Sequence, residues 1–281
     1  DGGVWVANRA FGIQASAVHV LLEDFVDRNG NGVADTSIDT NDNGKIDPSE
    51  ILPWDANGDG QPDDERIASV VQAGRDRNDP SQLRVNGVAR SIAVDANDDV
   101  WVGLFNLRQY EVYDGRNGTL KGIVPTAGTP YGATIDAEGR LWGATLEGRI
   151  DEVDTKSIAF VKSIAVPGTS YGITLDPDGV VWSSLVNEAR ILRYEPETGR
   201  IDTYATPNGE NTLRGIAVDR DRNVWTASSS ANRMVKFRFD TDHRTLIGRD
   251  FVPVGREPTA AVIDSDGFVW TTTMQDDKAW K

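Results

Sequence analysis

Hydrophobic and polar positions alternate in short segments along most of the chain, without the 3.6-residue period of a helix. Five segments share one order: an apolar run, a polar turn, and a second apolar run that contains a tryptophan. The first runs are SIAVD (91–95), GATID (132–136), GITLD (172–176), GIAVD (215–219) and AAVID (260–264). Turns such as DPDG and DSDG favour a tight hairpin between the two runs. The pattern therefore predicts pairs of antiparallel strands.

Two further strands are expected in each unit. Alternating segments such as ARILRYE (189–195) and NRMVKFRF (232–239) follow the tryptophan run, and segments such as RIDTYAT (200–206) precede the next unit. Each unit is thus expected to hold four short antiparallel strands.

The tryptophans give the period of the repeat. Six of the eight stand at positions 5, 101, 142, 182, 225 and 270, so that all separations but the first lie between 40 and 45 residues. Self-similarity at this period, with four strands per unit, is typical of a β-propeller. We expect an all-β fold in which residues 1–281 form one β-propeller domain of six blades, with seven as the alternative for a longer parent chain. The recurrent tryptophans should pack between blades, and the Asp residues of the hairpins should form turns and not metal sites.

The two ends of the chain interrupt the pattern. The first unit begins at its tryptophan strand, and the last stops after its tryptophan strand, which predicts three strands, four full blades and two strands. Either the two ends close one blade together, or their unpaired strands join a neighbour.

Residues 26–86 account for the long first separation of 96 residues between tryptophans. The segment has too few apolar residues for a core of its own, so we expect an excursion from the first blade and not a second domain.

The excursion carries three loops rich in Asp, Asn and Gly, all in one register. An EF-hand calcium loop has side-chain oxygens at positions 1, 3, 5 and 9, Gly at 6, a carbonyl at 7 and a bidentate Glu at 12. The middle loop matches throughout, with Asp39, Asn41, Asn43, Gly44, the carbonyl of Lys45, Asp47 and Glu50. Hard oxygen donors without His or Cys favour calcium over zinc or copper.

The flanking loops open in the same way. The first has Asp27, Asn29, Asn31, the carbonyl of Val33 and Asp35, and the third has Asp55, Asn57, Asp59, the carbonyl of Gln61 and Asp63. Position 12 is Ile38 in the first loop and Arg66 in the third, so each needs a ligand from elsewhere, such as Asp64, Glu65 or a neighbouring loop. We expect one to three Ca²⁺ ions. The array resembles the tandem calcium loops of thrombospondin type 3 and dockerin modules, since no long amphipathic helices flank it.

Charge and composition limit the binding partners and the cellular location that the chain can have. The net charge is −15, and residues 23–66, with 13 Asp or Glu and 3 Lys or Arg, carry −10 of it. Such a chain is a poor candidate for nucleic-acid binding, and no apolar run is long enough to span a membrane. Cysteine is absent, which excludes disulfides and thiolate chemistry. Loops of this kind fill where calcium is millimolar, so we expect an extracellular, periplasmic or cell-surface location, with any signal peptide removed.

The repeated pattern xGIAVDxDGxVW resembles the virginiamycin B lyase (streptogramin lyase) family, which shares the look of NHL and gluconolactonase-type propellers. The resemblance covers nearly all of the chain outside 26–86. It implies the fold, and it implies a lyase reaction through a His before the first-strand Gly, a Glu shortly after the Trp, and Mg²⁺. The positions that correspond to that His are Arg90, Tyr131, Tyr171, Arg214 and Thr259. The fold is therefore expected without the family's catalytic set.

Four of those positions form a second candidate site. Residues at the heads of the first strands point toward the mouth of a propeller's central channel. Arg90, Tyr131, Tyr171 and Arg214 would place hydrogen-bond donors and aromatic faces around that opening. Arg binds carboxylate or sulfate and Tyr stacks on sugar or peptide, which suits a small anionic or carbohydrate ligand. The alternative is that these residues only plug the entrance.

The expected function is a secreted or surface calcium-binding propeller that binds a protein, carbohydrate or small anion, with calcium in a structural role. One alternative is a metal-dependent lyase or lactonase-type hydrolase at the channel mouth. Another is a scaffold subunit of an extracellular assembly, joined through unpaired end strands.

Overall fold

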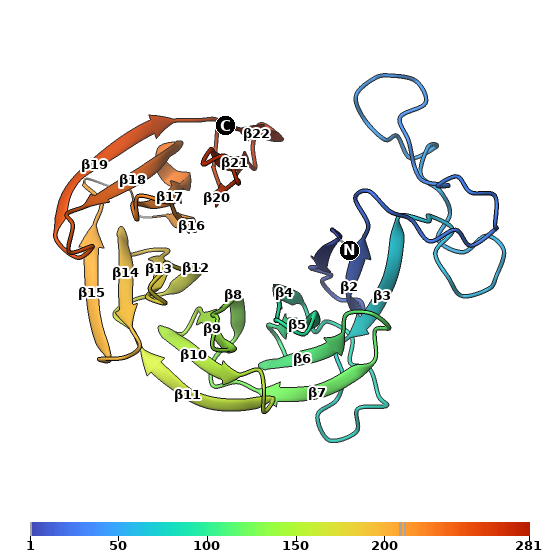
Figure 1. Cartoon of the computed structure of the whole chain (residues 1–281), viewed down its shortest axis with the longest axis horizontal. Coiled ribbons are helices and arrows are strands. Elements are labelled where there is room, and N and C mark those ends of the chain that lie inside the picture. The colour runs from blue at the N-terminus through green and yellow to red at the C-terminus, as the bar shows by residue number, and fades with distance from the viewer. Residues whose placement is uncertain (1, 208–209, 211) are drawn as a thin grey trace.

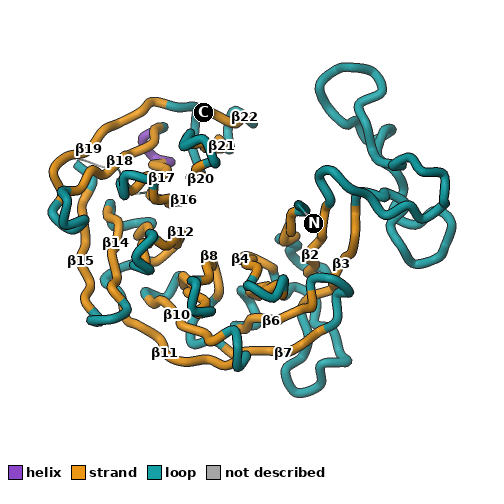
Figure 2. The backbone as a smooth tube through the Cα atoms, in the orientation of Figure 1, coloured by secondary structure: helices purple, strands orange, loops and turns teal. Residues whose placement is uncertain are grey.

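A computed structural model describes residues 2–207, 210 and 212–281 and arranges six antiparallel sheets as blades around a ring (Figure 1). Among the described residues the only helix is the 3₁₀ turn η1 (Ser229–Ala231), and the rest is strand and loop (Figure 2). The predicted all-β propeller with six blades is confirmed. No helix in the described part of the chain is long and apolar enough to cross a membrane.

Four blades have four strands in sequence order from the centre of the ring outward. The second blade holds β4 (Ala89–Val94), β5 (Asp99–Leu104), β6 (Gln109–Asp114) and β7 (Leu120–Pro125). The third holds β8 (Pro130–Ile135), β9 (Arg140–Thr145), β10 (Arg149–Asp154) and β11 (Ala159–Ala165). The fourth holds β12 (Ser170–Leu175), β13 (Val181–Leu185), β14 (Arg190–Glu195) and β15 (Arg200–Ala205). The fifth holds β16 (Leu213–Val218), β17 (Val224–Ser228), β18 (Arg233–Phe239) and β19 (Leu246–Pro253).

The first and last blades have three strands each. The first contains β1 (Val4–Asn8), β2 (Ala15–Val20) and β3 (Ile67–Ala73), and the last contains β20 (Val262–Ile263), β21 (Val269–Thr273) and β22 (Lys278–Trp280). The prediction of two strands in the last unit was wrong, because the short segment Lys278–Trp280 pairs with β21. The two ends belong to separate sheets, and the ring stays open between them (Figure 1).

One hydrogen bond repeats in five blades and explains why the hairpin Asp and the tryptophan recur together. The indole Nε1 donates to the carboxylate of the Asp six residues earlier over 2.7–3.1 Å, in the pairs Trp101–Asp95, Trp142–Asp136, Trp182–Asp176, Trp225–Asp219 and Trp270–Asp264. The other carboxylate oxygen accepts backbone amides of the turn, as Asp176 does from Val180 over 3.0 Å. The Asp residues are therefore turn formers, as expected, and they also orient the tryptophans between blades.

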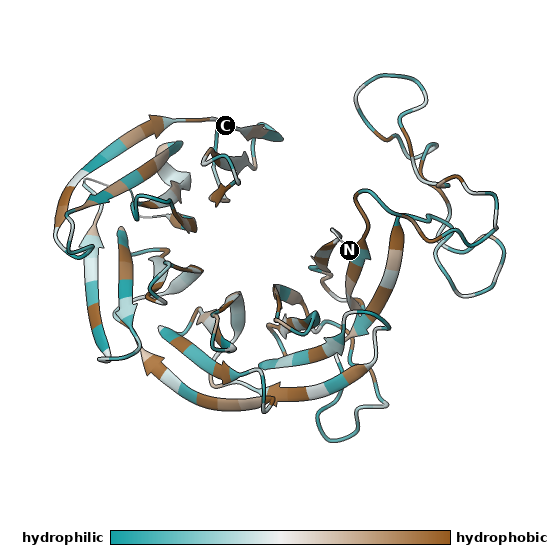
Figure 3. Cartoon of the chain, in the orientation of Figure 1, coloured by the Kyte–Doolittle hydropathy of each residue, from teal (hydrophilic) through white to brown (hydrophobic). Residues whose placement is uncertain are grey.

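The excursion predicted at 26–86 is not one continuous loop. Strand β3 lies within it and pairs with β2 as the outer strand of the first blade, so two loops remain, 21–66 and 74–88. The insertion displaced β3 from the period of the repeat, which concealed it. The 21–66 loop lies outside the ring and is largely hydrophilic (Figures 1 and 3).

Candidate functional site

The three loops of the excursion make the same turn around their first carboxylate. The glycine at position 6 donates its amide to the Asp at position 1, over 3.0, 2.6 and 3.0 Å (Gly32 to Asp27, Gly44 to Asp39, Gly60 to Asp55). These glycines have φ of +77°, +80° and +81°, a left-handed conformation that residues with a Cβ rarely adopt. The three loops, which align in sequence, therefore also share the same backbone turn.

Glu50 closes the middle loop. Its two carboxylate oxygens accept the amides of Thr40 and Asp47, each over 2.9 Å, which ties the second position of the loop to the ninth. A further hydrogen bond from the Thr40 hydroxyl lowers the pKa of Glu50, and the Asp47 amide adds to this effect. The carboxylate therefore stays ionised at the point where an EF-hand holds its bidentate ligand.

Glu65 makes the same pair of bonds in the first loop. Its oxygens accept the amide of Arg28 at position 2 over 2.7 Å and that of Asp35 at position 9 over 3.0 Å. Asp64, the neighbouring candidate, instead accepts the amide of Ser37 over 3.1 Å. Only the structure distinguishes these two adjacent carboxylates.

The Asn side chains of these two loops converge on the carboxylate at position 9. Asn29 and Asn31 donate Nδ2–H to Asp35 Oδ2 over 2.6 and 3.4 Å, and Asn41 and Asn43 donate to Asp47 Oδ2 over 3.0 and 2.7 Å. Positions 3, 5 and 9 therefore face one another in both loops.

The third loop has a different closure. The carboxylate of Asp63 accepts the amide of Ala56 over 2.9 Å, and the described residues offer no hydrogen-bond partner to the buried Oδ1 of Asp55. A cavity of about 340 Å³ separates this loop from the first, and its walls carry oxygen donors of both, Asn29, Asp35 and Glu65 from one side and Asn57, Asp59 and Asp63 from the other. The first and third loops thus face each other.

Carboxylates alone do not complete a metal site. Within the described residues, no three His, Asp or Glu side chains converge as a metal ligand set. Any ion in these loops would depend on amide and carbonyl oxygens as well, including the carbonyls of Val33, Lys45 and Gln61.

Three of the four predicted channel-mouth residues form a continuous row. The Arg90 guanidinium carbon lies 3.8 Å from the centre of the Tyr131 ring, and the Tyr131 and Tyr171 rings are 4.4 Å apart. Burial lowers the pKa of Arg90, and its Nε is buried without a hydrogen-bond partner among the described residues. The fourth residue, Arg214, donates to Met274 Sδ over 2.8 Å, at the blade that borders the opening.

Glu147 and Glu188, which follow the tryptophan strands of the third and fourth blades, bond backbone amides of their own blades. Glu147 accepts the amide of Thr129 over 2.9 Å, and Glu188 accepts that of Thr169 over 3.1 Å. Each carboxylate fixes the segment that leads into the first strand of its blade.

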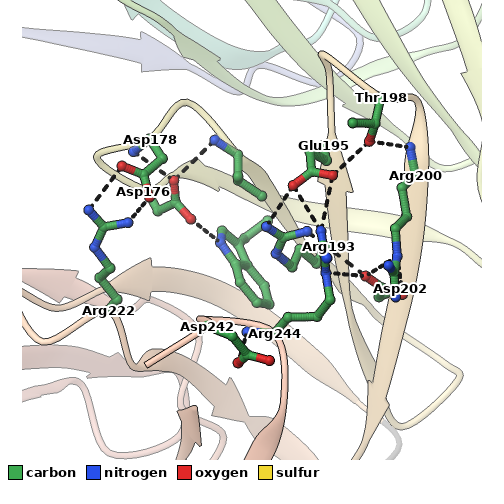
Figure 4. Close-up of polar contacts among 12 residues, drawn as sticks. Asp176, Asp178, Arg193, Glu195, Thr198, Arg200, Asp202, Arg222, Asp242 and Arg244 are labelled. Carbon is green, nitrogen blue, oxygen red and sulfur yellow. Dashed lines mark hydrogen bonds and ion pairs between the residues drawn. The ribbon is translucent and has the colours of Figure 1, made fainter. Parts of the chain in front are cut away.

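Sequence reasoning missed a network of charges between the fourth and fifth blades. Glu195 pairs with Arg193 over 3.2 Å and with Arg244 over 3.0 Å, and Asp202 pairs with Arg200 over 3.0 Å (Figure 4). The network borders a cavity of about 450 Å³. Because Arg244 comes from the neighbouring blade, no spacing along the chain could have indicated the cluster.

No known protein-family model matches the sequence, and no curated protein matches it. Among solved structures, a selenomethionine-substituted virginiamycin B lyase from Staphylococcus aureus has a TM-score of 0.57 at 19% identity, over 68% of each chain. A streptogramin B lyase has a TM-score of 0.61 at 18% identity, over 72% of this chain and 65% of that one. A catalytically inactive variant of the S. aureus virginiamycin B lyase with quinupristin has a TM-score of 0.59 at 21% identity, over 68% and 65%. The chain spans about two thirds of these lyases, and the likeness shows a β-propeller fold related to theirs.

Proposed function

We propose that this chain is a calcium-stabilised propeller that serves as a binding or interaction module outside the cytoplasm. The observation that carries the proposal is the hydrogen-bond frame that the first and middle loops share, in which one glutamate joins positions 2 and 9. If the segment were only a solvated acidic linker, its two loops would have no reason to share this hydrogen-bond pattern.

The donor set of the loops suits calcium. Every side-chain donor is an oxygen, and the buried Oδ1 of Asp55, which lacks a partner within the described residues, is the kind of atom that a bound cation satisfies. The Asn side chains at positions 3 and 5 also carry Oδ1 atoms, which accept backbone amides of their own loops, as Asn29 does from Asn31 over 3.0 Å, and which have a second lone pair for a cation. Bound calcium would supply positive charge to residues 23–66, which carry a net charge of −10 from 13 acidic and 3 basic residues.

The proposed ligands are the residues at the EF-hand ligand positions of the three loops. They are Asp27, Asn29, Asn31, Val33 and Asp35 in the first loop, Asp39, Asn41, Asn43, Lys45, Asp47 and Glu50 in the middle loop, and Asp55, Asn57, Asp59, Gln61 and Asp63 in the third. Asp64, the remaining candidate from the sequence, accepts the Ser37 amide over 3.1 Å and is not among the proposed ligands.

A calcium titration of the full chain tests the proposal. Calorimetry is expected to show up to three bound ions, and a chelator should lower the melting temperature of the excursion, because its carboxylates then repel one another. Magnesium at the same concentration is the control, since it demands a tighter octahedral site. A titration that shows no calcium binding up to millimolar concentration would overturn the proposal.

The channel mouth supports a ligand for this module. The guanidinium of Arg90, next to the faces of Tyr131 and Tyr171, suits a small carboxylate, a sulfate or an acidic sugar. Such ligands should raise the melting temperature of the wild type and leave that of Arg90→Gln unchanged. An equal rise in both proteins would place the ligand elsewhere.

A second candidate is a metal-dependent lyase or lactonase-type hydrolase at the same mouth, favoured by the likeness to streptogramin lyases. The described residues there, Arg90, Tyr131, Tyr171 and Arg214, include no histidine, so the binding module is the better-supported function. A scaffold role is the third candidate, in which the edge strands β1 and β22 pair with a neighbouring chain.

A further inference from the structure

Glu65 stands where the two ends of the excursion meet. The Leu21 amide donates to the Arg66 carbonyl over 2.8 Å and the Val26 amide to the Glu65 carbonyl over 2.9 Å. We call residues 21–28 and 64–67 the neck of the excursion. The neck continues directly into β2 on one side and β3 on the other.

Glu65 is also the buried carboxylate of this region. It is 2% exposed, and every other Asp and Glu of residues 21–66, all of them described, has more solvent access. The guanidinium of Arg28 donates to the carbonyls of Asp64 and Ile67, over 3.3 and 2.6 Å, and not to this carboxylate. Backbone amides hold this carboxylate and lower its pKa, and among the described residues no cationic side chain pairs with it, whereas a buried charge is usually paired.

The cavity beside Glu65 supplies room for that partner. Its walls include Asn29 and Asp35 of the first loop. The residues at the same positions of the middle loop, Asn41 and Asp47, donate their backbone amides to Glu50. The first loop has Ile38 at position 12 and therefore no closing carboxylate of its own. Glu65, which lies 37 residues after Arg28, makes in the first loop the hydrogen bonds that Glu50 makes in the middle loop.

We infer that Glu65 is the missing closing ligand of the first loop, so that the calcium ion held there joins the two ends of the neck and fixes β3 against β2. This inference rests on the proposed calcium binding. It divides the array by role: the first site attaches the excursion to the propeller, whereas the middle site orders only residues within the excursion.

The test compares three variants of the full chain, Glu65→Gln, Glu50→Gln and Asp64→Asn, by calorimetry and by hydrogen exchange with and without calcium. Glu65→Gln should bind one ion fewer than the wild type and lose the calcium-dependent protection of the Leu21, Val26 and Asp35 amides. Glu50→Gln should also lose one ion but keep that protection. Asp64→Asn, which removes the neighbouring carboxylate, should bind as many ions as the wild type.

The outcomes separate the two proposals. A wild type without calcium binding would refute the calcium function itself. A wild type that binds calcium, together with a Glu65→Gln variant of equal stoichiometry and affinity, would refute only the role of Glu65. If Glu65→Gln does not fold, Glu65→Asp keeps the charge and shortens its reach, and unchanged calcium affinity at every site of that variant would equally overturn the inference.

Discussion

Replacing Trp101 with alanine is expected to lower the free energy of unfolding by about 3–5 kcal/mol, the usual cost of removing a large buried aromatic side chain. The indole is 0% exposed and packs in one cluster with Tyr110 of its own blade and Leu141 of the next. Its loss leaves a cavity between two blades and removes the indole N–H that donates to Asp95 Oδ2. Urea denaturation followed by circular dichroism measures the change.

Trp270→Ala provides the matched control. Trp270 occupies the same position of the repeat and bonds Asp264 over 2.7 Å, but it is 37% exposed in a blade of three strands. Its replacement should cost roughly half as much or less, because the hydrophobic contribution scales with buried apolar area. Equal losses from the two variants would show that the indole hydrogen bond, and not packing between blades, dominates.

The blades could be predicted because each unit carries its own local determinants. The turn Asp, the tryptophan six residues later and the apolar runs on either side all lie within one hairpin. Residues that are close together in the sequence are therefore also in contact in the fold. This holds for every blade with four strands.

The two strands that the sequence did not reveal lack such determinants. Strand β3 follows a long insertion and so falls outside the period, and its sequence IASVVQA does not alternate between apolar and polar residues, although it pairs with β2. Strand β22 has only three residues, too short for any periodicity, and the register with β21 defines it.

The candidate sites show the same contrast between features set by local sequence and features set by contacts between distant residues. The turn of the middle loop and its closure by Glu50 could be predicted because all of the positions involved lie in one contiguous segment. The closing residue of the first loop could not, because Asp64 and Glu65 are adjacent in the chain and only the fold directs one of them toward Arg28. The row from Arg90 to Tyr171 was predictable since each member heads a first strand, whereas the network around Glu195 depends on contacts between blades.

The middle loop offers the sharpest test of calcium chemistry. Glu50→Gln keeps the acceptor oxygen for Thr40 but removes one negative charge and the bidentate carboxylate. We expect calcium affinity at this site to fall by more than the roughly 10- to 100-fold loss that second-shell partners alone produce. Calorimetry at several calcium concentrations resolves this site from the other two.

Lys45→Ala is the control within the same loop. In the proposed site Lys45 would contribute only its backbone carbonyl, at position 7, and its side chain is exposed, so truncation should leave calcium affinity close to the wild-type value. Gly44→Ala should weaken binding instead, because φ of +80° strains any residue with a Cβ although no atom lies within 4 Å of the added methyl group. Full affinity in Glu50→Gln would mean that the loop folds by its hydrogen bonds alone and that calcium binds elsewhere.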